Sequence, residues 1–212
     1  MDLWQRLDAT ATRWDVLQHP FYTRWSKGEL RSDELSFYAG QYAYAVRALA
    51  SATRHAAALA PNGTAAAELE SHAAEEQAHI ELWSRFGDAV GASSEEAALD
   101  ETAACSTAWH DPDRGYLPTL VALYAIESAQ PAISETKRAG LVEHYGFESG
   151  VGTDYFDLHA VRDTEHAASG RALIQAELDS VEDEDALVAE AERVLEANWR
   201  LLDGVERRGG SA

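Results

Sequence analysis

The sequence predicts an all-α protein that folds as one helical bundle. Apolar residues recur at spacings of three and four along most of the 212-residue chain, which is the periodicity of amphipathic helices. Almost no segment alternates apolar and polar residues in the way a half-buried strand does. Glycine and proline fall between the periodic segments and divide the chain into helices. These features together favour helix packing on helix and exclude a sheet-based fold.

The N-terminal part of the chain is expected to form three helices. The first covers about residues 2–17 and ends before Pro20, because proline cannot continue a helix. A short helix follows over 21–26. Ser32 and the acidic residues after it are typical of an N-cap and a first helical turn, which predicts a long helix over 32–60.

The middle of the chain is expected to form a long and a shorter helix. The long one runs over about 64–90 and stops at Gly91. Ser93 and Glu96 have the spacing of a capping box, which predicts the shorter helix over about 93–111.

Four further helices are expected toward the C-terminus. Pro131 forces a break or kink between helices over 115–129 and 131–145. A long helix then spans about 153–178, and the last one covers about 183–205.

The sequence predicts one domain over residues 1–212, with 206–212 as a frayed tail. No internal repeat, long linker or change in composition divides the chain. Its length is sufficient to bury a core of its own.

Composition excludes several classes of partner. The net charge of −20 argues against nucleic acid and against anionic lipid, since both require clustered positive charge. No apolar run approaches the ~20 residues of a membrane-spanning helix, and the first residues lack a signal-peptide pattern. The single cysteine, Cys105, cannot form an internal disulfide. A cytoplasmic protein is therefore expected.

His159, Asp163 and His166 form the strongest local pattern. On a helix, positions i, i+4 and i+7 fall within an arc of about 60°. Two imidazoles and a carboxylate on one face are suitable ligands for iron, manganese or zinc. A polar surface stripe or a helix-packing network would give the same spacing.

Glu75, Glu76 and His79 form a second pattern. His79 lies three residues after Glu76 and four after Glu75, so either carboxylate shares a helix face with it. Glu-x-x-His on bundle helices recurs in dinuclear carboxylate sites. A solvated acidic face is the alternative, but Trp83 on this face favours an inward orientation. His72 on the same face is expected to support the ligands or to be a core histidine.

Glu127 follows an apolar run over 120–126 that is expected to be buried. Burying a carboxylate is costly unless it is paired, protonated or bound to a metal. Arg138 or another cation would supply the pairing in a buried salt bridge, and a metal would explain the residue equally well.

Taken together, these patterns favour a dinuclear metal site. Three helices supply carboxylates and histidines, which is the donor set of such a site inside a helical bundle. The chain has no Gly-rich phosphate loop and no Gly-x-Ser-x-Gly elbow. Cys105 is expected to be an inert structural cysteine.

Four parts of the chain match one known family: Phe21-Tyr22-Thr23-Arg24-Trp25-Ser26-Lys27-Gly28-Glu29-Leu30, His79-Ile80-Glu81-Leu82-Trp83, Ala122-Leu123-Tyr124-Ala125-Ile126-Glu127-Ser128 and the triplet of His159, Asp163 and His166. They resemble the CADD-type para-aminobenzoate synthases, which are haem-oxygenase-like dimetal oxidases. The TenA thiaminases and PqqC are wider relatives of that fold. The similarity extends over about residues 20–175 and implies a seven-helix haem-oxygenase-like bundle.

The resemblance implies two metal ions, Fe/Fe or Mn/Fe, that activate O2 with electrons from an external reductant. Glu127 matches the bridging ligand of that family. The implied ligands as a whole are Glu75 or Glu76, His79, Glu127, His159, Asp163 and His166.

The resemblance also implies a self-sacrificing reaction. In that family one of the enzyme's own tyrosines supplies the ring of para-aminobenzoate, and a lysine is the proposed amine donor. Tyr22 matches the tyrosine, and Lys137, one of only two lysines in the chain, matches the lysine. Tyr38 and Tyr42 resemble aromatic residues that line the site. Without the resemblance, Tyr22 would be a core aromatic residue and Lys137 a solvated residue on its helix.

The sequence departs from the family before His79. The segment between the first ligand and His79 is shorter than in the para-aminobenzoate synthases, which leaves Glu75 and Glu76 as rivals for one position. Alignment favours Glu75, whereas the Glu-x-x-His spacing and the apolar face favour Glu76.

The expected function is therefore an O2-dependent dimetal oxidase that forms para-aminobenzoate, a folate precursor, from its own tyrosine. One alternative is an oxidase of the same fold that acts on an external amino acid or fatty acid. The other is a metal-free TenA-like hydrolase or binding protein. A homodimer and an electron donor are the expected partners.

Overall fold

The fold is built from α-helices, as the sequence predicts. The computed structural model describes residues 1–93, 97–178 and 183–209, and these residues contain no β-strand. The helices are α1 (Leu3–Arg13), the 3-10 helix η1 (Val16–Gln18), α2 (Pro20–Ser26), α3 (Ser32–Leu59), α4 (Gly63–Ala89), α5 (Asp100–Trp109), α6 (Tyr116–Glu127), α7 (Gln130–His144), α8 (Asp154–Glu177) and α9 (Glu184–Gly209).

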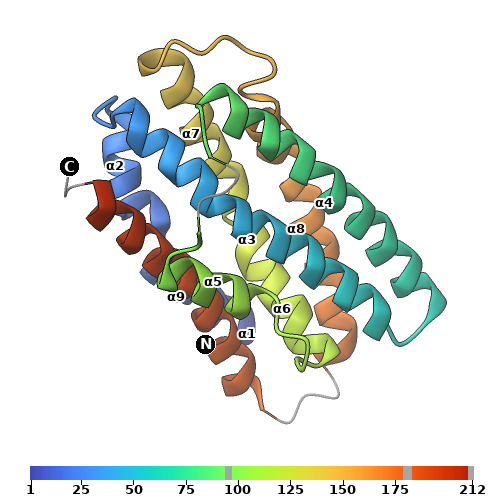
Figure 1. Ribbon diagram of the computed structural model, residues 1–212. Coiled ribbons are helices and arrows are strands. Elements are labelled where there is room, and N and C mark those ends of the chain that lie inside the picture. Colours follow the sequence, from blue (N-terminus) through green and yellow to red (C-terminus); the bar gives the residue numbers. More distant parts are fainter. Residues whose placement is uncertain (94–96, 179–182, 210–212) are drawn as a thin grey trace.

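The long helices α3 and α4 form one side of the bundle and pack along each other (Figure 1). Helix α8 packs on α4, α6 and α7, and α9 packs on α1, α5 and α6. If the short α2 is counted as a connection and α6 and α7 as halves of one kinked helix, the described residues form the expected seven-helix bundle.

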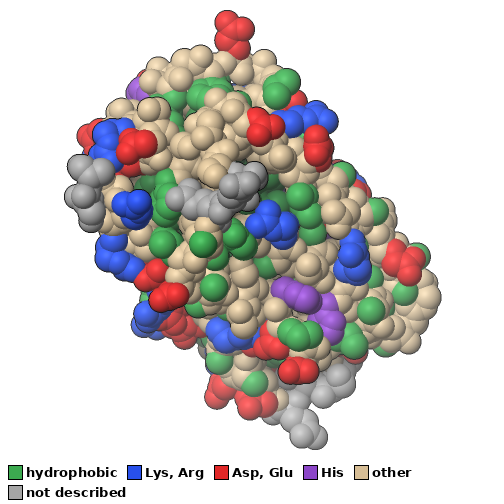
Figure 2. Space-filling model, viewed as in Figure 1, with side chains coloured by type: hydrophobic (Ala, Val, Ile, Leu, Met, Phe, Trp, Pro, Cys, Tyr) green, Lys and Arg blue, Asp and Glu red, His purple; other side chains and the backbone are tan. Residues whose placement is uncertain are grey.

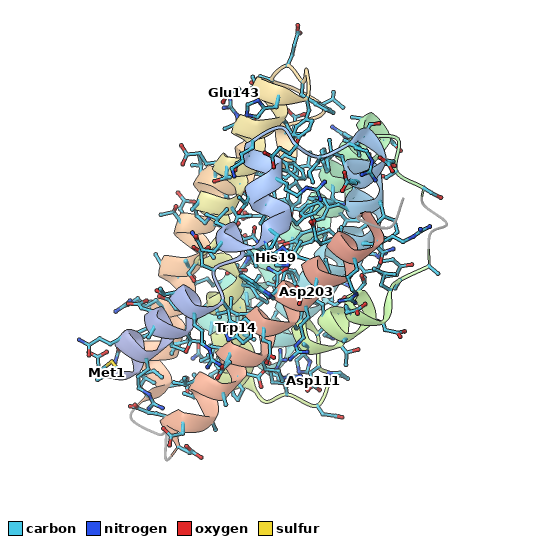
Figure 3. The ribbon with its side chains drawn as sticks, turned by 90° about the vertical axis from the view of Figure 1, so that its left-hand side faces the viewer. Met1, Trp14, His19, Asp111, Glu143 and Asp203 are labelled. Carbon is cyan, nitrogen blue, oxygen red and sulfur yellow. The ribbon has the colours of Figure 1, made fainter. Side chains whose placement is uncertain are left out.

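The N-terminal segment is divided earlier than the sequence predicts. Helix α1 ends at Arg13, and the Asp15 side chain caps η1 by accepting a hydrogen bond from the Leu17 N–H. His19 then begins α2, because its Nδ1 accepts a hydrogen bond from the Phe21 N–H. The other ring nitrogen, Nε2, lies 3.1 Å from Asp203 on α9 (Figure 3). These contacts fix the start of the helix that carries the predicted Tyr22.

The next two helices begin close to the expected positions. Arg31, one residue before the expected Ser32, is the N-cap of α3, and the Glu34 carboxylate accepts a hydrogen bond from the Arg31 N–H. Asn62 caps α4 by accepting hydrogen bonds from the first backbone N–H groups of that helix.

Helix α5 starts later than the capping-box pattern predicts. Glu96 of that pattern lies outside the described residues, and the helix begins at Asp100. The Gln41 side chain on α3 accepts hydrogen bonds from the Leu99 N–H and from the Thr102 hydroxyl. A side chain from another helix therefore fixes this terminus, which a local sequence pattern cannot reveal.

The break between α6 and α7 is confirmed. Helix α6 ends at Glu127 and α7 begins at Gln130, with Pro131 in its first turn. Proline is tolerated there because the first backbone N–H groups of a helix have no partner within the helix.

The last helix extends further than expected. Residues 206–209, predicted to fray, are helical, and Glu206 accepts hydrogen bonds from Arg24 on α2. Arg207 forms an ion pair with Glu101 on α5. The rest of the expected tail, 210–212, lies outside the described residues.

The surface is acidic and charged groups of both signs are mixed on it. On the face shown in Figure 2, Lys and Arg side chains are scattered and lie beside Asp and Glu. Among the described helices, none is both long enough and apolar enough to cross a membrane.

Candidate metal centre

Helix α4 presents three potential metal ligands on one face. His72, Glu76 and His79 follow one another at intervals of four and three residues, so their side chains leave the same side of the helix. Glu76 and His79 are buried, and His72 is partly buried. Trp83, one turn further on, continues this face into the aromatic core.

Helices α8 and α6 supply the opposing side chains. His159, Asp163 and His166 on α8 are all buried, as is Glu127 at the last residue of α6. Since α8 packs on both α4 and α6, the three helices bring their polar residues into one place in the apolar core.

The potential ligands form two groups that share Glu76. The first group is His72, Glu76, Glu127 and His166, and the second is Glu76, His79 and His159. Within each group the potential ligand atoms lie within 4.8 Å of one another. One Glu76 oxygen, Oε1, lies 3.0 Å from His79 Nδ1 and 3.8 Å from His166 Nδ1. Glu76 therefore lies where the two groups of potential ligands meet.

Polar atoms at the centre of this cluster have no hydrogen bond within the described parts of the chain. The atoms concerned are His72 Nε2, Glu76 Oε1, His79 Nδ1, Glu127 Oε1, His159 Nε2, both carboxylate oxygens of Asp163 and His166 Nδ1. Buried polar groups are nearly always hydrogen-bonded, so this concentration needs a physical cause. Cations bound between these atoms would satisfy them. Carboxylate and imidazole donors suit iron and manganese, and the residues therefore fit a two-metal centre.

Two histidines are held with one nitrogen toward the cluster. His159 Nδ1 lies 2.6 Å from the Tyr155 carbonyl oxygen, which can only accept, so this nitrogen carries the proton. His166 Nε2 lies 3.3 Å from a Glu75 carboxylate oxygen. In both rings the other nitrogen is thereby left with a lone pair that faces the cluster.

The structure distinguishes Glu75 from Glu76, which the sequence left as rivals. Glu76 belongs to both groups of potential ligands, whereas Glu75 belongs to neither. Arg162 donates hydrogen bonds to both oxygens of Glu75, at 2.6 and 2.7 Å. These bonds lower the pKa of Glu75 to about 2. Glu75 is a partly exposed carboxylate at the edge of the cluster.

Three further expectations change with the geometry. The sequence predicts His72 to be a supporting or core residue, but its Nε2 lies 3.0 Å from Glu127 Oε1 and it belongs to the first group. Its spacing of four residues before Glu76 was the available signal. Glu76 rather than Glu127 lies in both groups. Arg138, the possible partner of Glu127, instead forms an ion pair with Asp157.

Burial and mutual proximity shift the pKa values of these groups. Burial raises the pKa of Asp163 to about 7 and lowers that of His159 to about 4. Burial acts against protonation of His72 as well, but the carboxylates of Glu127 and Glu76 outweigh it and raise its pKa to about 10. The carboxylates and imidazoles thus partly neutralise one another in the protein alone.

The predicted tyrosines and lysine lie together in a second, aromatic compartment. Tyr22, Tyr38, Tyr42 and Lys137 come from α2, α3 and α7 and are each at most 2% exposed. Lys137 Nζ donates a hydrogen bond of 2.8 Å to the Tyr38 hydroxyl, which lies 2.8 Å from the Tyr22 hydroxyl. Lys137 Nζ also lies 4.8 Å from the centre of the Tyr22 ring. The solvated position considered for Lys137 is therefore wrong.

Ring contacts connect this compartment with the metal-type cluster. The Tyr42 and Trp83 ring centres are 5.0 Å apart, and those of Trp83 and Tyr155 are 4.8 Å apart. Tyr155 in turn stacks on His159 at 4.0 Å. The two sites are thus neighbours in one continuous core.

Residues 37–199 match the model of a family described as iron-containing redox enzymes. This span includes every residue of the two metal-ligand groups. The chain belongs to this family. The matched segment also includes Tyr38, Tyr42 and Lys137, whereas Tyr22 precedes it.

Among curated proteins, this member of the iron-containing redox enzymes is similar to several 4-aminobenzoate (para-aminobenzoate) synthases. It is 31% identical to that of Chlamydia muridarum, over 96% of this chain and 89% of the relative. It is 29% identical to that of Nitrosomonas europaea, over 95% and 89% of the two chains.

Solved structures confirm the haem-oxygenase-like fold of this iron-containing redox enzyme. A domain with a haem-oxygenase-like fold from Shewanella denitrificans superimposes with a TM-score of 0.81 at 18% identity, over 98% of this chain and 93% of the other. A TenA homologue from P. horikoshii superimposes with a TM-score of 0.78 at 15% identity, over 99% and 100%.

Proposed function

We propose that this iron-containing redox enzyme forms 4-aminobenzoate with O2, taking the ring from its own Tyr22 and the nitrogen from Lys137. The observation that carries the proposal is the enclosure of one lysine amine against one tyrosine ring, 4.8 Å apart, beside a cluster of metal-type ligands. The similarity to 4-aminobenzoate synthases over nearly the whole chain supports the product.

Two metal ions, Fe/Fe or Mn/Fe, would be held by residues from α4, α6 and α8. Glu76 would bridge them because it belongs to both groups of ligands, and Asp163 would bind through its unpaired oxygens. The full set proposed is His72, Glu76, His79, Glu127, His159, Asp163 and His166. When bound, the metals would supply the one-electron chemistry needed to reduce O2.

Tyr22 provides the seven carbon atoms that the product needs. The ring and Cβ remain together, so the reaction breaks the Cα–Cβ bond of Tyr22 and oxidises Cβ to the carboxylate, with O2 as oxidant. The phenol C–O bond breaks and its oxygen leaves as water, while nitrogen from Lys137 takes its place. The Cε–N bond of Lys137 then breaks by hydrolysis after oxidation of Cε by O2, which leaves an aldehyde on that side chain. The protein cannot rebuild these side chains, so each chain would complete about one turnover.

Lys137 is prepared to act as an amine. Burial lowers its pKa well below the usual value, and among the described residues its amine is hydrogen-bonded to the Tyr38 hydroxyl and to no carboxylate. An uncharged amine has a free lone pair, which a nitrogen donor requires. The hydrogen bond to Tyr38 directs this nitrogen toward the Tyr22 ring.

Tyr38 and Tyr42 line the compartment and would orient the reacting groups. The Tyr38 hydroxyl contacts both Lys137 and Tyr22, while Gln130 donates a hydrogen bond to the Tyr42 hydroxyl. Burial raises the pKa of both tyrosines, so their hydroxyls keep their protons.

An external electron donor and a second copy of the chain are the proposed partners. Oxidation by O2 at a metal centre needs reducing electrons, and no redox group other than the proposed centre follows from the residues. Four of the exposed large hydrophobic residues lie on α7, the following loop and α8: Val142, Val151, Leu158 and Val161. This surface is the proposed homodimer contact, and light scattering of wild type and Val161→Glu tests it.

An external small-molecule substrate is the second candidate. A surface cleft of about 220 Å³ reaches the potential ligand Asp163 and is also lined by Thr164 and Arg171. A carboxylic acid bound to Arg171 would place its chain beside the metal centre. Many turnovers on an added amino acid or fatty acid, unaffected by Tyr22→Phe, would support this function over the self-sacrificing one.

Mass spectrometry of product and protein tests the proposal. Metal-free chain is loaded with Fe(II), with or without Mn(II), and then receives O2 and a reductant. We expect 4-aminobenzoate in the filtrate and a mass loss on the peptide that contains Tyr22. Protein labelled with 15N only in lysine should give 15N product, since Lys27 is the only other lysine.

Two variants provide the controls. Tyr22→Phe should abolish product without loss of metal, whereas Tyr116→Phe on α6 should leave product formation intact. Full product yield from Tyr22→Phe would overturn the self-sacrificing reaction. Metal uptake and O2 consumption without product would direct the search to an external substrate.

A further inference from the structure

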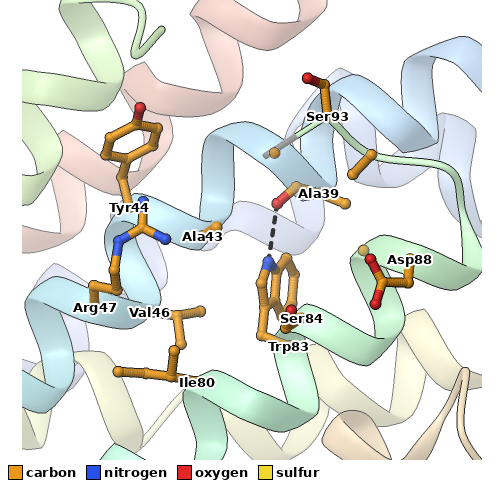
Figure 4. Close-up of a pocket in the computed structure, with 13 residues that line it drawn as sticks. Ala39, Ala43, Tyr44, Val46, Arg47, Ile80, Trp83, Ser84, Asp88 and Ser93 are labelled. Carbon is orange, nitrogen blue, oxygen red and sulfur yellow. Dashed lines mark hydrogen bonds between the residues drawn. The ribbon is translucent and has the colours of Figure 1, made fainter. Parts of the chain in front are cut away.

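A cleft between α3 and α4 is lined by Trp83 (Figure 4), whose ring also contacts Tyr42 of the aromatic compartment. Its volume is about 170 Å³, and its apolar walls include Ala39, Ala43, Val46 and Ile80. Pockets for drug-sized ligands typically occupy about 300–1,000 Å³. The cleft therefore suits a molecule with a single ring.

Trp83 separates this cleft from the compartment. The residue lines the cleft, although it is only 2% exposed, and its indole N–H is bonded to the Ala39 carbonyl oxygen (Figure 4). On its other side the ring lies 5.0 Å from the Tyr42 ring and 5.9 Å from Lys137 Nζ. One side chain thus stands between the cleft and the place where the aromatic product would form.

The two ends of the cleft carry opposite charges. Arg47 and Asp88 lie on opposite sides of Trp83 in Figure 4. Among the described residues, Arg47 forms no ion pair and its guanidinium lies 4.6 Å from the Tyr44 ring centre. The Asp88 carboxylate likewise makes no ion pair within the described parts of the chain.

We propose that this cleft binds the aromatic carboxylate that the compartment releases, with the carboxylate on Arg47 and the amino group toward Asp88. A guanidinium binds a carboxylate through two parallel hydrogen bonds. The apolar walls cover the ring, and Asp88 accepts a hydrogen bond from the amino group at the opposite end. This inference rests on the proposed function, because the ligand is the proposed product.

Titration of the purified wild-type chain with 4-aminobenzoate, by calorimetry and ligand-observed NMR, tests the cleft. We expect saturable binding of one molecule per chain. Arg47→Gln should weaken it about tenfold or more, since a charge-assisted contact is lost. Arg54→Gln is the matched control, because this arginine lies on the same helix outside the cleft and contacts Gln77. It should leave the affinity unchanged.

Two ligand analogues identify the ends of the bound molecule. 4-Aminobenzamide, which lacks the carboxylate charge, should bind wild type as weakly as 4-aminobenzoate binds the Arg47→Gln variant. Asp88→Asn should weaken 4-aminobenzoate but not benzoate. Equal affinity of the Arg47 and Arg54 variants, or no saturable binding to wild type, would overturn the inference.

The test separates this inference from the proposed function, since the ligand is added rather than synthesised. If the protein forms 4-aminobenzoate but shows no Arg47-dependent binding, the proposed function is supported and the binding site in the cleft is contradicted. If the protein binds 4-aminobenzoate through Arg47 but forms none of it with metal, O2 and reductant, the binding site is supported and the proposed function is contradicted.

Discussion

Glu75 holds His166 from the side opposite the metal cluster. Its Oε2 lies 3.3 Å from His166 Nε2, and the same oxygen accepts a hydrogen bond of 2.6 Å from Arg162 Nε. A histidine that donates one N–H to a carboxylate is fixed in orientation and is a more basic ligand through its other nitrogen. The two adjacent glutamates of α4 therefore have different contacts: Glu75 pairs with Arg162 and His166, and Glu76 belongs to both groups of potential ligands.

Replacing Glu75 should weaken metal binding without removing a ligand. Loss of such a supporting carboxylate typically lowers metal affinity by about 10–100-fold. We expect Glu75→Ala to show this loss and Glu75→Gln, which keeps an acceptor, to lose less. The measurement is competition with a coloured chelator. Glu81→Ala, which changes an exposed residue on the same helix, is the control. An equal loss of metal affinity in this variant would contradict a specific effect of Glu75.

Substitutions within the cluster should change how many metal ions bind. Glu76→Gln removes the carboxylate that both groups share and should lower the content from two ions per chain toward none. His79→Ala removes a ligand of the second group only and should leave about one ion. Metal analysis after repletion measures both variants. Retention of two ions by Glu76→Gln would exclude a bridging Glu76.

Gly140 allows α2 to approach α7 and so places Tyr22 near Lys137. A Cβ at this position would lie 2.6 Å from a ring carbon of Trp25, whose indole N–H is bonded to the Lys137 carbonyl oxygen. Gly140→Ala should therefore destabilise the protein by about 1–3 kcal/mol through overpacking. Urea unfolding measures this change. Gly63→Ala is the control, because a Cβ there meets nothing within 4 Å, and it should cost little.

The sequence predicted the helices and most of the cluster for a clear reason. Spacings of three, four and seven place side chains on one helix face, so the triplet around Asp163 and the pair of Glu76 and His79 were visible without a structure. Pro131 likewise marked the break before α7, because proline's effect is local.

The features that the sequence did not predict depend on contacts between distant segments. The choice between Glu75 and Glu76 depends on Arg162, which is 86 residues further along the chain than Glu76. His72 could not be assigned because its partner Glu127 lies on another helix. The start of α5 is fixed by Gln41 on α3 in the same way. No spacing within one helix contains this information.

Removing metal should lower the thermal stability of the protein. Among the residues that the structure describes, buried carboxylates and imidazoles of the cluster have no hydrogen bonds, and cations that bind only the folded state stabilise it. At a free metal concentration of 100 times Kd the stabilisation per site is about 2.7 kcal/mol. We expect a higher Tm with Fe(II) or Mn(II) under anaerobic conditions and a return to the metal-free value after chelation. The Glu76→Gln variant, as control, should show little response to either metal.

The buried Lys137 should make stability depend on pH. Its pKa in the folded protein is well below the 10.5 of a free lysine because burial disfavours the charge. Between these two values the unfolded chain binds one more proton than the folded chain, so the free energy of unfolding increases with pH, by about 1.4 kcal/mol per unit. Lys137→Met removes this contribution and keeps an apolar side chain of similar length.

Unfolding of metal-free wild type and Lys137→Met at about pH 8.0 and about pH 9.5 measures the effect, because both pH values lie below the pKa of the unfolded lysine. We expect the variant to be the more stable protein at the lower pH and its advantage to shrink at the higher one, since wild type gains stability as its unfolded lysine loses the proton. Lys27→Met, at a position outside the compartment, should show a constant difference from wild type. A constant difference for Lys137→Met as well would mean that the amine keeps its proton when buried, and it would then lack the lone pair that a nitrogen donor requires.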